Sequence, residues 1–384
     1  MAGAKKTTAP SATAAGKKKN LGHVLVIGGC GFLGHHVVNV LLRDYACAAV
    51  SVVDLVCTRY RRPDSDGVRY YDADITDLVS LVSVFDEARP DVVIHTASPL
   101  AQGETKTAHA LFKKVNVDGT AAVIEACCKT GVKVLVYTSS ASVVSDNYND
   151  LINADERWPV IRGKEQTQYY SETKAEAEEM VLKANEPGKL LTCAIRPSGI
   201  FGEGDRQAIV GILKVYLERK HRWQVGANDN LCDYTYVENV VHGHLLAVHA
   251  LLATWALPEP LSADERVDGE VFIITNDSPI YFWDFNRAIW RAAGWDGADM
   301  GSVWHLGRDV GLLLGSLAEW GAWLARKNPT FTYQRCVFAC MTRYFDITKA
   351  KKRLGYVPQV SLEEGVRRGV AWAMEQHRQE AAKA

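Results

Sequence analysis

The sequence has few of the features that mark specialised classes of protein. Its 384 residues include nine cysteines, but no Cys-x-x-Cys pair, which argues against a disulfide framework or a zinc domain. Residues 1–20 contain no apolar segment that could act as a signal peptide. No solenoid repeat occurs, and the uncharged apolar stretch 310–318 is far shorter than the roughly 20 residues that span a bilayer. We therefore expect reduced, mostly buried thiols.

A strong charge of one sign is also lacking. Lys plus Arg number 44 and Asp plus Glu number 45, for a net charge of -1. Residues 1–20 nevertheless contain five lysines and no acid, which leaves 39 basic against 45 acidic residues in the rest. An acidic body argues against nucleic acid as a partner. Residues 1–20 are predicted to be a disordered basic tail, whose lysines would be attracted to anionic lipid.

The chain does have a regular alternation of strands and helices. Short Val- and Ile-rich runs predict strands at 24–27, 50–53, 68–71, 92–95, 134–138 and 192–195. Amphipathic segments predict helices at 34–43, 77–88, 108–129 and 168–184. This alternation indicates the α/β class, with a Rossmann-type doubly wound parallel sheet. We expect an NAD(P)-binding core over 21–196 and a smaller, mostly helical substrate lobe over 197–384, with returning core elements.

Bulky apolar residues gather in the second half. Nine of the ten tryptophans follow residue 220, either as ordinary core or as the lining of a site for a large, flat substrate. An apolar helix is predicted near 303–324, and three roles stay open for it: packing on its own lobe, lying in a membrane surface, or spanning the membrane. The side chains that share its apolar face are Leu306, Val310, Leu313, Leu314, Leu317 and Trp320.

A glycine-rich turn separates the first predicted strand from the first predicted helix. It reads Gly28-Gly29-Cys30-Gly31-Phe32-Leu33-Gly34. Glycines three residues apart in this context allow a sharp turn, a close approach of backbone to a pyrophosphate, and tight packing of the helix on the strand. The free N–H groups of the helix N-terminus meet the phosphate charge. The turn therefore predicts a dinucleotide site.

Asp54 indicates which dinucleotide binds. It ends the second predicted strand, where a carboxylate can accept hydrogen bonds from both ribose hydroxyls and repel a 2'-phosphate. This favours NAD. NADP stays possible, because three arginines that could neutralise such a phosphate follow closely: Arg59, Arg61 and Arg62.

Asp74 and Ile75 follow the third predicted strand, in a position to meet the adenine. Asp74 has an alternative role as the N-cap of the next helix, which begins near residue 77. Both readings place its carboxylate in the turn after the strand.

A Tyr-x-x-x-Lys pair supplies the candidate chemistry. Tyr170, unlike Tyr169, has a lysine four residues later, Lys174, and on a helix these two side chains share a face. A free tyrosine has a pKa near ~10, so acting as a base at neutral pH requires about 4 kcal/mol of stabilisation of the phenolate. Lys174 and a positively charged nicotinamide ring are the expected sources. The alternative is an exposed tyrosine beside a surface lysine.

A hydroxyl group is the expected third member of the site. Residues 138–142 read Thr-Ser-Ser-Ala-Ser and follow a predicted strand at the carboxyl edge of the sheet, where ligands bind. A serine there can hydrogen-bond the substrate oxygen and stabilise charge that develops on it. Spacing alone does not decide among Ser139, Ser140 and Ser142.

These motifs together resemble the extended short-chain dehydrogenase/reductases, over about residues 22–376. The resemblance rests on the glycine turn, Asp74-Ile75, the Thr-Ser-Ser-Ala run, Tyr170 with Lys174, and residues 116–120. Residues 95–99, 195–202 and 234–240 are similar to the 3-beta-hydroxysteroid dehydrogenase branch. Within that branch, residues 153–159, 272–277 and 349–358 resemble the fungal decarboxylating sterol-4-alpha-carboxylate dehydrogenases.

The resemblance assigns roles to single positions. It implies that Ser140 holds the substrate oxygen, that Tyr170 is the acid/base, and that Lys174 binds the nicotinamide ribose and tunes the tyrosine. Besides residues 28–34, Asp54, Asp74 and Ile75, the implied cofactor contacts are Thr96, Ala97, Ser98, Asn116, Tyr170, Lys174, Pro197, Ser198, Gly199 and Ile200. One departure is the stretch 144–149, which is more polar than in the family and bears on the substrate contacts next to Ser140.

The resemblance also implies a reaction. A 4-carboxysterol would be oxidised at its 3-beta-hydroxyl with NAD or NADP, giving a 3-keto sterol and carbon dioxide without a metal. A steroid dehydrogenase without decarboxylation, a sugar-nucleotide epimerase and a non-enzymatic dinucleotide sensor remain as alternatives. The implied location is the endoplasmic reticulum membrane, peripheral or monotopic and facing the cytosol. The implied partners are other enzymes of sterol C-4 demethylation, and a homodimer is compatible.

Overall fold

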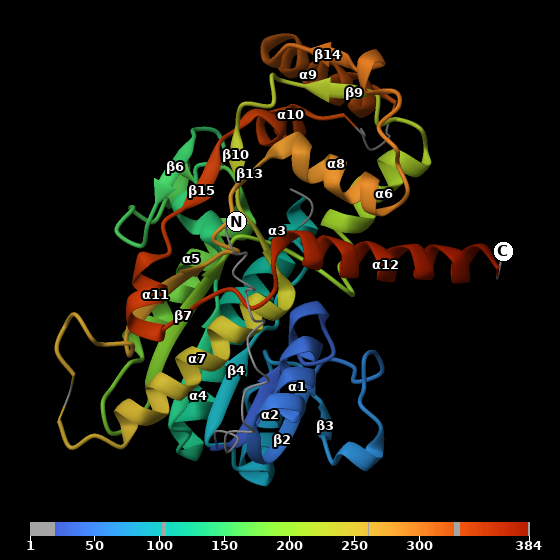
Figure 1. Ribbon diagram of the computed structural model, residues 1–384. Helices are drawn as coiled ribbons and strands as arrows, with labels where there is room; N and C mark the ends of the chain where they lie inside the picture. The colour runs from blue at the N-terminus through green and yellow to red at the C-terminus, as the bar shows by residue number, and fades with distance from the viewer. Residues whose placement is uncertain (1–19, 102–104, 260, 326–330, 383–384) are drawn as a thin grey trace, which may run out of the picture.

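A seven-stranded parallel sheet forms the centre of the computed structural model, which describes residues 20–101, 105–259, 261–325 and 331–382 (Figure 1). Its order is β12-β7-β5-β4-β1-β2-β3, so the order reverses beside β1, where ligands bind in doubly wound sheets. The predicted fold class is confirmed. The predicted tail lies outside the described residues except for Asn20, which begins β1. The strands are β1 (Asn20–Ile27), β2 (Ala46–Asp54), β3 (Arg69–Asp72), β4 (Val92–His95), β5 (Val134–Thr138), β7 (Leu191–Pro197) and β12 (Glu270–Ile274).

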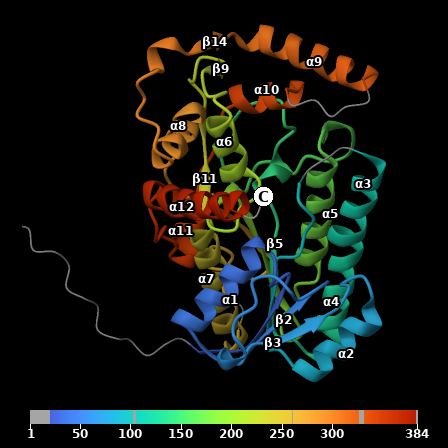
Figure 2. The same cartoon turned by 90° about the vertical axis from the view of Figure 1, so that its right-hand side faces the viewer.

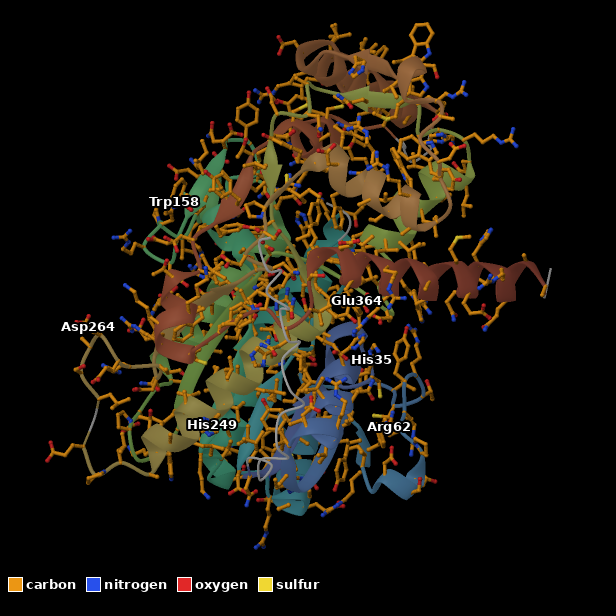
Figure 3. The ribbon with its side chains drawn as sticks, in the orientation of Figure 1. His35, Arg62, Trp158, His249, Asp264 and Glu364 are labelled. Carbon is orange, nitrogen blue, oxygen red and sulfur yellow. The ribbon has the colours of Figure 1, made fainter. Side chains whose placement is uncertain are left out.

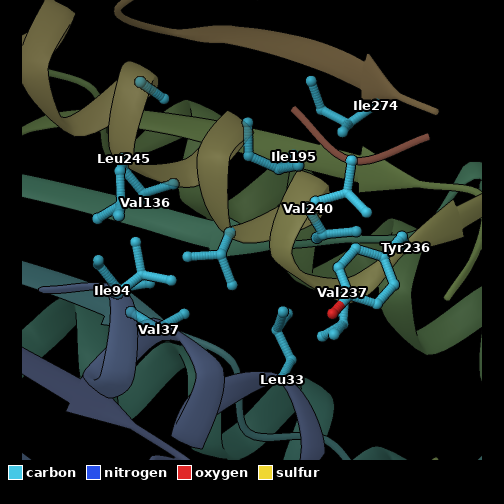
Figure 4. Packing of buried hydrophobic residues seen from close by; sticks show 14 of the residues in the cluster. Leu33, Val37, Ile94, Val136, Ile195, Tyr236, Val237, Val240, Leu245 and Ile274 are labelled. Atoms are coloured by element: carbon cyan, nitrogen blue, oxygen red, sulfur yellow. The ribbon is translucent and has the colours of Figure 1, made fainter. Parts of the chain in front are cut away.

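Helices cover both faces of this sheet (Figure 2). Alternate residues of β1 point to opposite faces: Val24 and Val26 belong to one hydrophobic cluster, Leu25 and Ile27 to the other. Side chains of α1 and α7 close the first cluster over β4, β5 and β7 (Figure 4), and α2, α4 and α5 close the second. Burial on both faces explains why the strands are almost wholly apolar. The helices are α1 (Phe32–Asp44), α2 (Leu78–Ala88), α4 (Gly119–Thr130), α5 (Tyr169–Lys183) and α7 (Val237–Trp255).

The predicted elements are present with two differences. All six predicted strands occur, and β12 is a seventh strand that the alternation did not reveal, because lobe elements separate it from β7 in the sequence. The helix predicted over 108–129 is divided into α3 (Lys106–Phe112), a π-helical segment (Lys113–Asp118) and α4. Such π segments are rare and are frequent at functional sites.

The C-terminal lobe lies over the carboxyl edge of the sheet (Figure 1). The chain passes between core and lobe several times, since β6 from the first half joins a small sheet of order β13-β10-β15-β6. In the other direction, α7, α11 and β12 return to the core. The remaining helices are α6 (Ala208–Leu217), α8 (Phe282–Ala292), α9 (Arg308–Leu324), α10 (Tyr333–Cys340), α11 (Thr348–Leu354) and α12 (Leu362–Ala381). The remaining strands are β6 (Leu151–Ala154), β8 (Gly199–Phe201), β9 (Trp223–Val225), β10 (Leu231–Cys232), β11 (Tyr234–Tyr236), β13 (Ile280–Tyr281), β14 (Trp304–Leu306) and β15 (Arg343–Phe345). Short 3-10 helices are η1 (Asp64–Asp66), η3 (Ala141–Val144), η4 (Gly163–Glu165) and η5 (Met300–Ser302).

The predicted apolar helix is α9, and it faces the lobe with Leu312 and with small residues. Gly311 and Gly315 are buried, and a Cβ on Gly315 would lie 2.7 Å from the backbone N of Tyr333 in α10. Leu306 lies before the helix, in β14. The other residues of the predicted apolar face point outward, with 43% to 63% exposure: Val310, Leu313, Leu314, Leu317 and Trp320. Among the described residues, no helix is long and apolar enough to cross a membrane.

The tryptophans divide between core and surface. Trp290 and Trp295 are buried and pack around His221. Trp223 and Trp304 stack on each other, with ring centroids 5.9 Å apart, and stay exposed. In the part of the chain that the structure describes, no tryptophan lines the cavity that holds Tyr170. Trp290 and Trp295 therefore have the expected role in the core. The expected role in lining the substrate site is not seen for any tryptophan among the described residues.

Candidate active site

Two joined cavities follow the carboxyl edge of the main sheet. The first, of about 560 Å³, lies along the glycine turn after β1. The second, of about 480 Å³, holds Ser140, Tyr170 and Lys174. Both are lined by Phe32 and Thr96, so the groove is continuous from the turn to the tyrosine. The dinucleotide site predicted from the glycine turn and the catalytic site predicted from Tyr170 and Lys174 are therefore two parts of one groove.

The glycine turn has the close contacts that its spacing predicted. Gly28 has a φ of +79°, and a Cβ there would lie 2.7 Å from the backbone N of Ala97. A Cβ on Gly34 would lie 2.1 Å from the carbonyl oxygen of Gly28. Gly29 packs against Val52 instead and is not part of the cavity wall. The first and last glycines thus keep the turn narrow, and the N-terminus of α1 opens into the cavity.

Asp54 is fixed beside this turn. Its carboxylate accepts hydrogen bonds from the backbone N of Cys30 (3.0 Å) and of Leu55 (2.8 Å). Burial raises the pKa of Asp54, and these two hydrogen bonds offset part of the rise. The group lines the first cavity at the end of β2, as a partner for a ribose would.

The three arginines after Asp54 are not equivalent. Arg61 lies over the ring of Tyr70, at 4.4 Å from the centroid. Arg62 lies at the outer edge of the core (Figure 3), with its Nε 2.8 Å from Asp66 Oδ2. Of the three, only Arg59 lines the cofactor cavity. Of the cluster that kept NADP possible, one arginine therefore lines the cavity, beside the half-buried carboxylate of Asp54, which favours NAD.

Asp74 and Ile75 line the same cavity. The Asp74 carboxylate accepts hydrogen bonds from Thr76 and from Lys114 Nζ at 2.9 Å, and these partners lower its pKa. The cap of α2 is a different residue, Asp77, which accepts from the backbone N–H groups of its first turn. The alternative role of Asp74 as that cap is therefore not what the structure shows.

The residues present fit a dinucleotide. Glycines at positions that a Cβ would fill form one wall, and Asp54, the acid expected to bind the ribose, lines the same cavity. The predicted cofactor residues that line the first cavity are Gly28, Cys30, Gly31, Phe32, Leu33, Gly34, Asp54, Asp74, Ile75, Thr96, Ala97 and Ser98. Those that line the second are Tyr170, Lys174, Pro197, Ser198, Gly199 and Ile200.

Asn116 lies behind this wall. Its side chain is 1% exposed and sits in the π-helical segment, where its amide N donates to Thr173 Oγ1 (3.0 Å) and its oxygen accepts from Ser98 Oγ (3.0 Å). Thr173 precedes Lys174, so Asn116 ties the loop after β4 to the catalytic helix α5. Its side chain positions other residues rather than facing the groove.

Tyr170 is half-buried at the start of α5, with its ring edge-on to Phe112. Burial raises the pKa of this phenol, and a hydrogen bond with Ser98 offsets only part of the rise. The cofactor-free protein therefore keeps Tyr170 protonated. The stabilisation that a phenolate needs is therefore expected from positive charge in the groove, that of Lys174 and that of a bound cofactor.

Lys174 is almost wholly buried one helical turn later. Its Nζ donates to the backbone oxygen of Thr138 (2.7 Å) and to Tyr137 Oη (3.1 Å). Burial lowers the pKa of Lys174 to about 7. Tyr137 is a residue that the sequence analysis missed, and no motif marked it, since it lies inside an ordinary apolar strand.

The serines after β5 form a chain of hydroxyl groups. Ser171 Oγ donates to Ser142 Oγ (2.9 Å), which lies 2.8 Å from Ser140 Oγ. Ser140 also accepts from the backbone N of Ser142, as the cap of η3. Ser139 is 2% exposed, and its hydroxyl has no partner among the described residues. Ser140 lines the cavity, and its hydroxyl can donate to a ligand oxygen when Ser142 is the donor in the hydrogen bond between the two serines.

Residues outside the motifs, from the stretch 144–149 and from the C-terminal lobe, complete the wall of the second cavity. The polar stretch 144–149 contributes Ser145 and Asn147 to the second cavity, and the Asn147 backbone oxygen accepts from Gln334 of α10. The remaining wall residues from the lobe are Asp205, Gln207, Asp233, Tyr234, Phe338, Arg343 and Phe345. They come from loops, short strands and the helix α10, which are far apart in the sequence, so no local pattern predicted them.

Solved structures of two epimerases in complex with NAD share this fold. The chain superposes on a Thermus thermophilus UDP-glucose 4-epimerase complex with NAD with a TM-score of 0.63 and 22% identity, covering 92% of this chain and 99% of that one. A UDP-glucuronic acid 4-epimerase from Bacillus cereus, in complex with NAD, gives a TM-score of 0.66 with 19% identity, covering 92% and 99%. At these identities the likeness concerns the fold alone.

Curated proteins are similar over nearly the whole chain. A decarboxylating sterol-4-alpha-carboxylate 3-dehydrogenase of Schizosaccharomyces pombe is 43% identical over 91% of this chain and 96% of its own length. Its namesake in Saccharomyces cerevisiae is 40% identical over 91% and 97%. A mouse protein of that name is 38% identical over 90% and 89%. The family model described as "3-beta hydroxysteroid dehydrogenase/isomerase family" matches residues 25–307. The chain therefore belongs to the 3-beta hydroxysteroid dehydrogenase/isomerase family.

Proposed function

We propose that this protein oxidises the 3-beta-hydroxyl of a 4-carboxysterol with NAD and that the product loses its carboxylate as carbon dioxide. The observation that carries the proposal is the single groove in which Ser140, Tyr170 and Lys174 continue a dinucleotide site. Relatives that are 38% to 43% identical over about nine-tenths of the chain bear the name of that reaction.

Each group around the reacting C3 oxygen has its own role in the oxidation. NAD, when bound, accepts the two electrons and the hydrogen that leave C3 of the sterol. Tyr170 removes the proton of the 3-hydroxyl, and Ser140 donates a hydrogen bond to the same oxygen. Lys174 lies one turn behind Tyr170, where its ammonium favours the phenolate. The C3 oxygen ends as a ketone, and the phenol of Tyr170 holds the proton.

Decarboxylation needs no further group. The bond between C4 and the carboxylate carbon breaks, carbon dioxide leaves, and the electron pair moves through C4 into the ketone, which becomes an enolate. Ser140 and the protonated Tyr170 face that oxygen and stabilise its charge. A proton from water then restores C4.

The direct test is incubation with a 4-carboxysterol and NAD while reduced cofactor and carbon dioxide are both measured. Equal amounts of the two products are expected. Reduced cofactor alone would favour a steroid dehydrogenase without decarboxylation. If neither product forms although NAD binds, the protein is a dinucleotide sensor.

We also propose that the protein works at the endoplasmic reticulum membrane, beside other enzymes of sterol C-4 demethylation. The substrate is nearly insoluble in water, and α9 presents an outward apolar face at the end of the molecule opposite α2 and β2 (Figure 1). An amphipathic helix of this kind can lie in a membrane surface.

Flotation with liposomes tests this location. The double variant Leu313→Glu and Leu314→Glu should float less than the unmodified protein. Val357→Glu is the matched control, because Val357 is an equally exposed apolar side chain (61%) outside α9. Equal flotation of the double variant and the control would dismiss α9 as the contact.

A further inference from the structure

One cation in the wall of the catalytic cavity is not used by the proposed mechanism. Among the described residues that line this cavity, only Lys174 and Arg343 carry a basic side chain of lysine or arginine. Lys174 is engaged with the strand β5. Arg343 belongs to β15 of the lobe and is half-buried.

The guanidinium of Arg343 is held by uncharged partners. Its Nη1 donates to the backbone oxygen of Phe338 (2.8 Å), and its Cζ lies 4.6 Å from the centroid of the Phe338 ring. A hydrogen bond from Arg343 also lowers the pKa of Tyr234, which burial raises. Within the described part of the chain, no carboxylate forms an ion pair with it. The side chain is thus fixed in place while its charge remains unbalanced.

The strand β15 brings Arg343 close to the catalytic serine. Successive side chains of a strand alternate, so Arg343 and Phe345 share a face, and both line the cavity. Phe345 packs against the cluster that contains Val143 and Val144 of η3. Ser140 is the N-cap residue of η3, and it lines the same cavity as Arg343.

The acids of this cavity do not neutralise Arg343. Asp205 accepts three backbone N–H groups at the start of α6. Asp233 accepts from the backbone N of Phe345 with one oxygen, while its other oxygen is buried and unpartnered. Burial raises the pKa of Asp233 to about 7, so that this acid is partly neutral near physiological pH.

We propose that Arg343 binds the carboxylate at C4 of the substrate; this inference rests on the function proposed above. A carboxylate that enters a half-buried cavity needs a charged partner, because burying it unpaired is costly. A planar guanidinium suits that partner better than an ammonium does, since it offers parallel donors in a fixed geometry. Ser140 and Tyr170 hold the neighbouring C3 oxygen, so the two recognised groups sit on adjacent carbons.

The assignment gives the site a way to distinguish substrate from product. Release of carbon dioxide removes the negative charge from the sterol, and the ion pair with Arg343 is lost. The decarboxylated ketone keeps only its apolar contacts and the hydrogen bonds at C3. Arg343 therefore contributes to the affinity for the acid and not to that for the product.

The test compares two sterols that differ only at C4: a 3-beta-hydroxy-4-alpha-carboxycholestane and cholestanol, each carried by cyclodextrin. Arg343→Met should lower kcat/KM for the carboxysterol roughly 10- to 100-fold, mainly through KM, because a hydrogen-bonded charge is lost. The value for cholestanol should change less than about threefold. Arg343→Lys should recover part of the loss. Arg157→Met, at a side chain that is 91% exposed, is the matched control and should leave both values unchanged.

A structural role of Arg343 predicts a different pattern, namely equal losses on the two sterols, and that pattern would overturn the proposal. So would an unchanged KM for the carboxysterol.

Binding to the Tyr170→Phe protein with NAD separates this inference from the proposed function. If the unmodified protein releases no carbon dioxide, yet Arg343→Met in the Tyr170→Phe protein weakens binding of the carboxysterol alone, the function fails and the inference stands. If the carboxysterol binds no better than cholestanol, the inference fails whatever the turnover.

Discussion

The cofactor half and the substrate half of the groove are built in different ways. Most of the cofactor half comes from the turns after β1, β2, β3 and β4, between residues 28 and 100, and a few residues within 111–115 and 204–207 complete its lining. The substrate half is assembled mainly from η3, β6, α5, the segment 197–200, β11, α10 and β15, between residues 138 and 345. The first half presents backbone to its ligand, and the second presents side chains of several kinds.

This difference extends to how charged groups are satisfied. Asp54 and Asp74 are already hydrogen-bonded within the protein, by backbone N–H groups and by Lys114. In the substrate half, one carboxylate oxygen of Asp233 is buried without a hydrogen-bond partner among the described residues. The guanidinium of Arg343 donates to a backbone oxygen and has no charged partner in the same part of the chain. The carboxylates of the cofactor half are thus satisfied within the protein, whereas the substrate half keeps groups that a ligand could satisfy. The following experiments test that contrast, from the largest expected effect to the smallest.

Tyr170→Phe should have the largest effect, and only on the chemistry. Loss of the acid/base group is expected to lower kcat roughly 100- to 10,000-fold. NAD binding, measured by the change in protein fluorescence, should stay within about twofold, because the cofactor wall is unchanged. Turnover close to that of the unmodified protein would contradict the role of the tyrosine. A large loss of NAD affinity would contradict the separation of the two halves.

Lys174→Met should lower the activity and raise the free energy of unfolding. The unfolded lysine has a pKa near ~10.4, whereas burial lowers the pKa to about 7 in the folded protein. Between these two pH values the unfolded chain binds more protons than the folded protein does. The destabilisation of the folded protein by the buried Lys174 ammonium is therefore complete below pH 7 and decreases as the pH rises. Removing it should therefore raise the free energy of unfolding more at pH 6 than at pH 9, by about 2 to 3 kcal/mol.

The measurement is urea unfolding of the cofactor-free protein at both pH values. Lys183→Met is the matched control, because Lys183 lies on the same helix with 73% of its side chain exposed. Its effect should be the same at the two pH values. A gain for Lys174→Met that did not depend on pH would show that the buried charge is not the cause.

Gly34→Ala tests whether the cofactor half depends on close backbone contact. A methyl group there would lie 2.1 Å from the Gly28 oxygen, so the turn must shift. We expect a loss of about 1 to 3 kcal/mol in unfolding free energy, together with weaker NAD binding. Gly211→Ala is the control in the lobe: nothing lies within 4 Å of that Cβ in α6, and this substitution should gain about 0.4 to 1 kcal/mol. Unchanged NAD affinity in Gly34→Ala would contradict the proposal that NAD binding depends on the narrow glycine turn.

The same contrast explains what could be predicted from the sequence. The sheet, the glycine turn, Asp54 and the pair of Tyr170 with Lys174 are local patterns, and the structure places them in one groove. No local pattern marks Tyr137 or Arg343. Tyr137 matters because it contacts Lys174, which lies 37 residues later in the sequence. Arg343 reaches the cavity because β15 pairs with β6 and β10, which come from distant parts of the chain. The outward direction of the apolar residues of α9 could not be predicted either, since periodicity identifies a face but not what covers it.

The smallest effect is expected on the outer face of α9, where neighbouring leucines give opposite predictions. Leu312 packs against Val225 and Cys336, whereas Leu313 is 60% exposed. Leu312→Glu should place a charge against this small cluster and cost roughly 1 to 3 kcal/mol of unfolding free energy. Leu313→Glu should change that energy by less than about 0.5 kcal/mol in detergent-free solution. The order should reverse in liposome flotation, where only the outer residue meets lipid. If both variants were equally destabilised, the outer face would already be covered within the protein or by a second copy of it, and the membrane proposal would lose its contact surface.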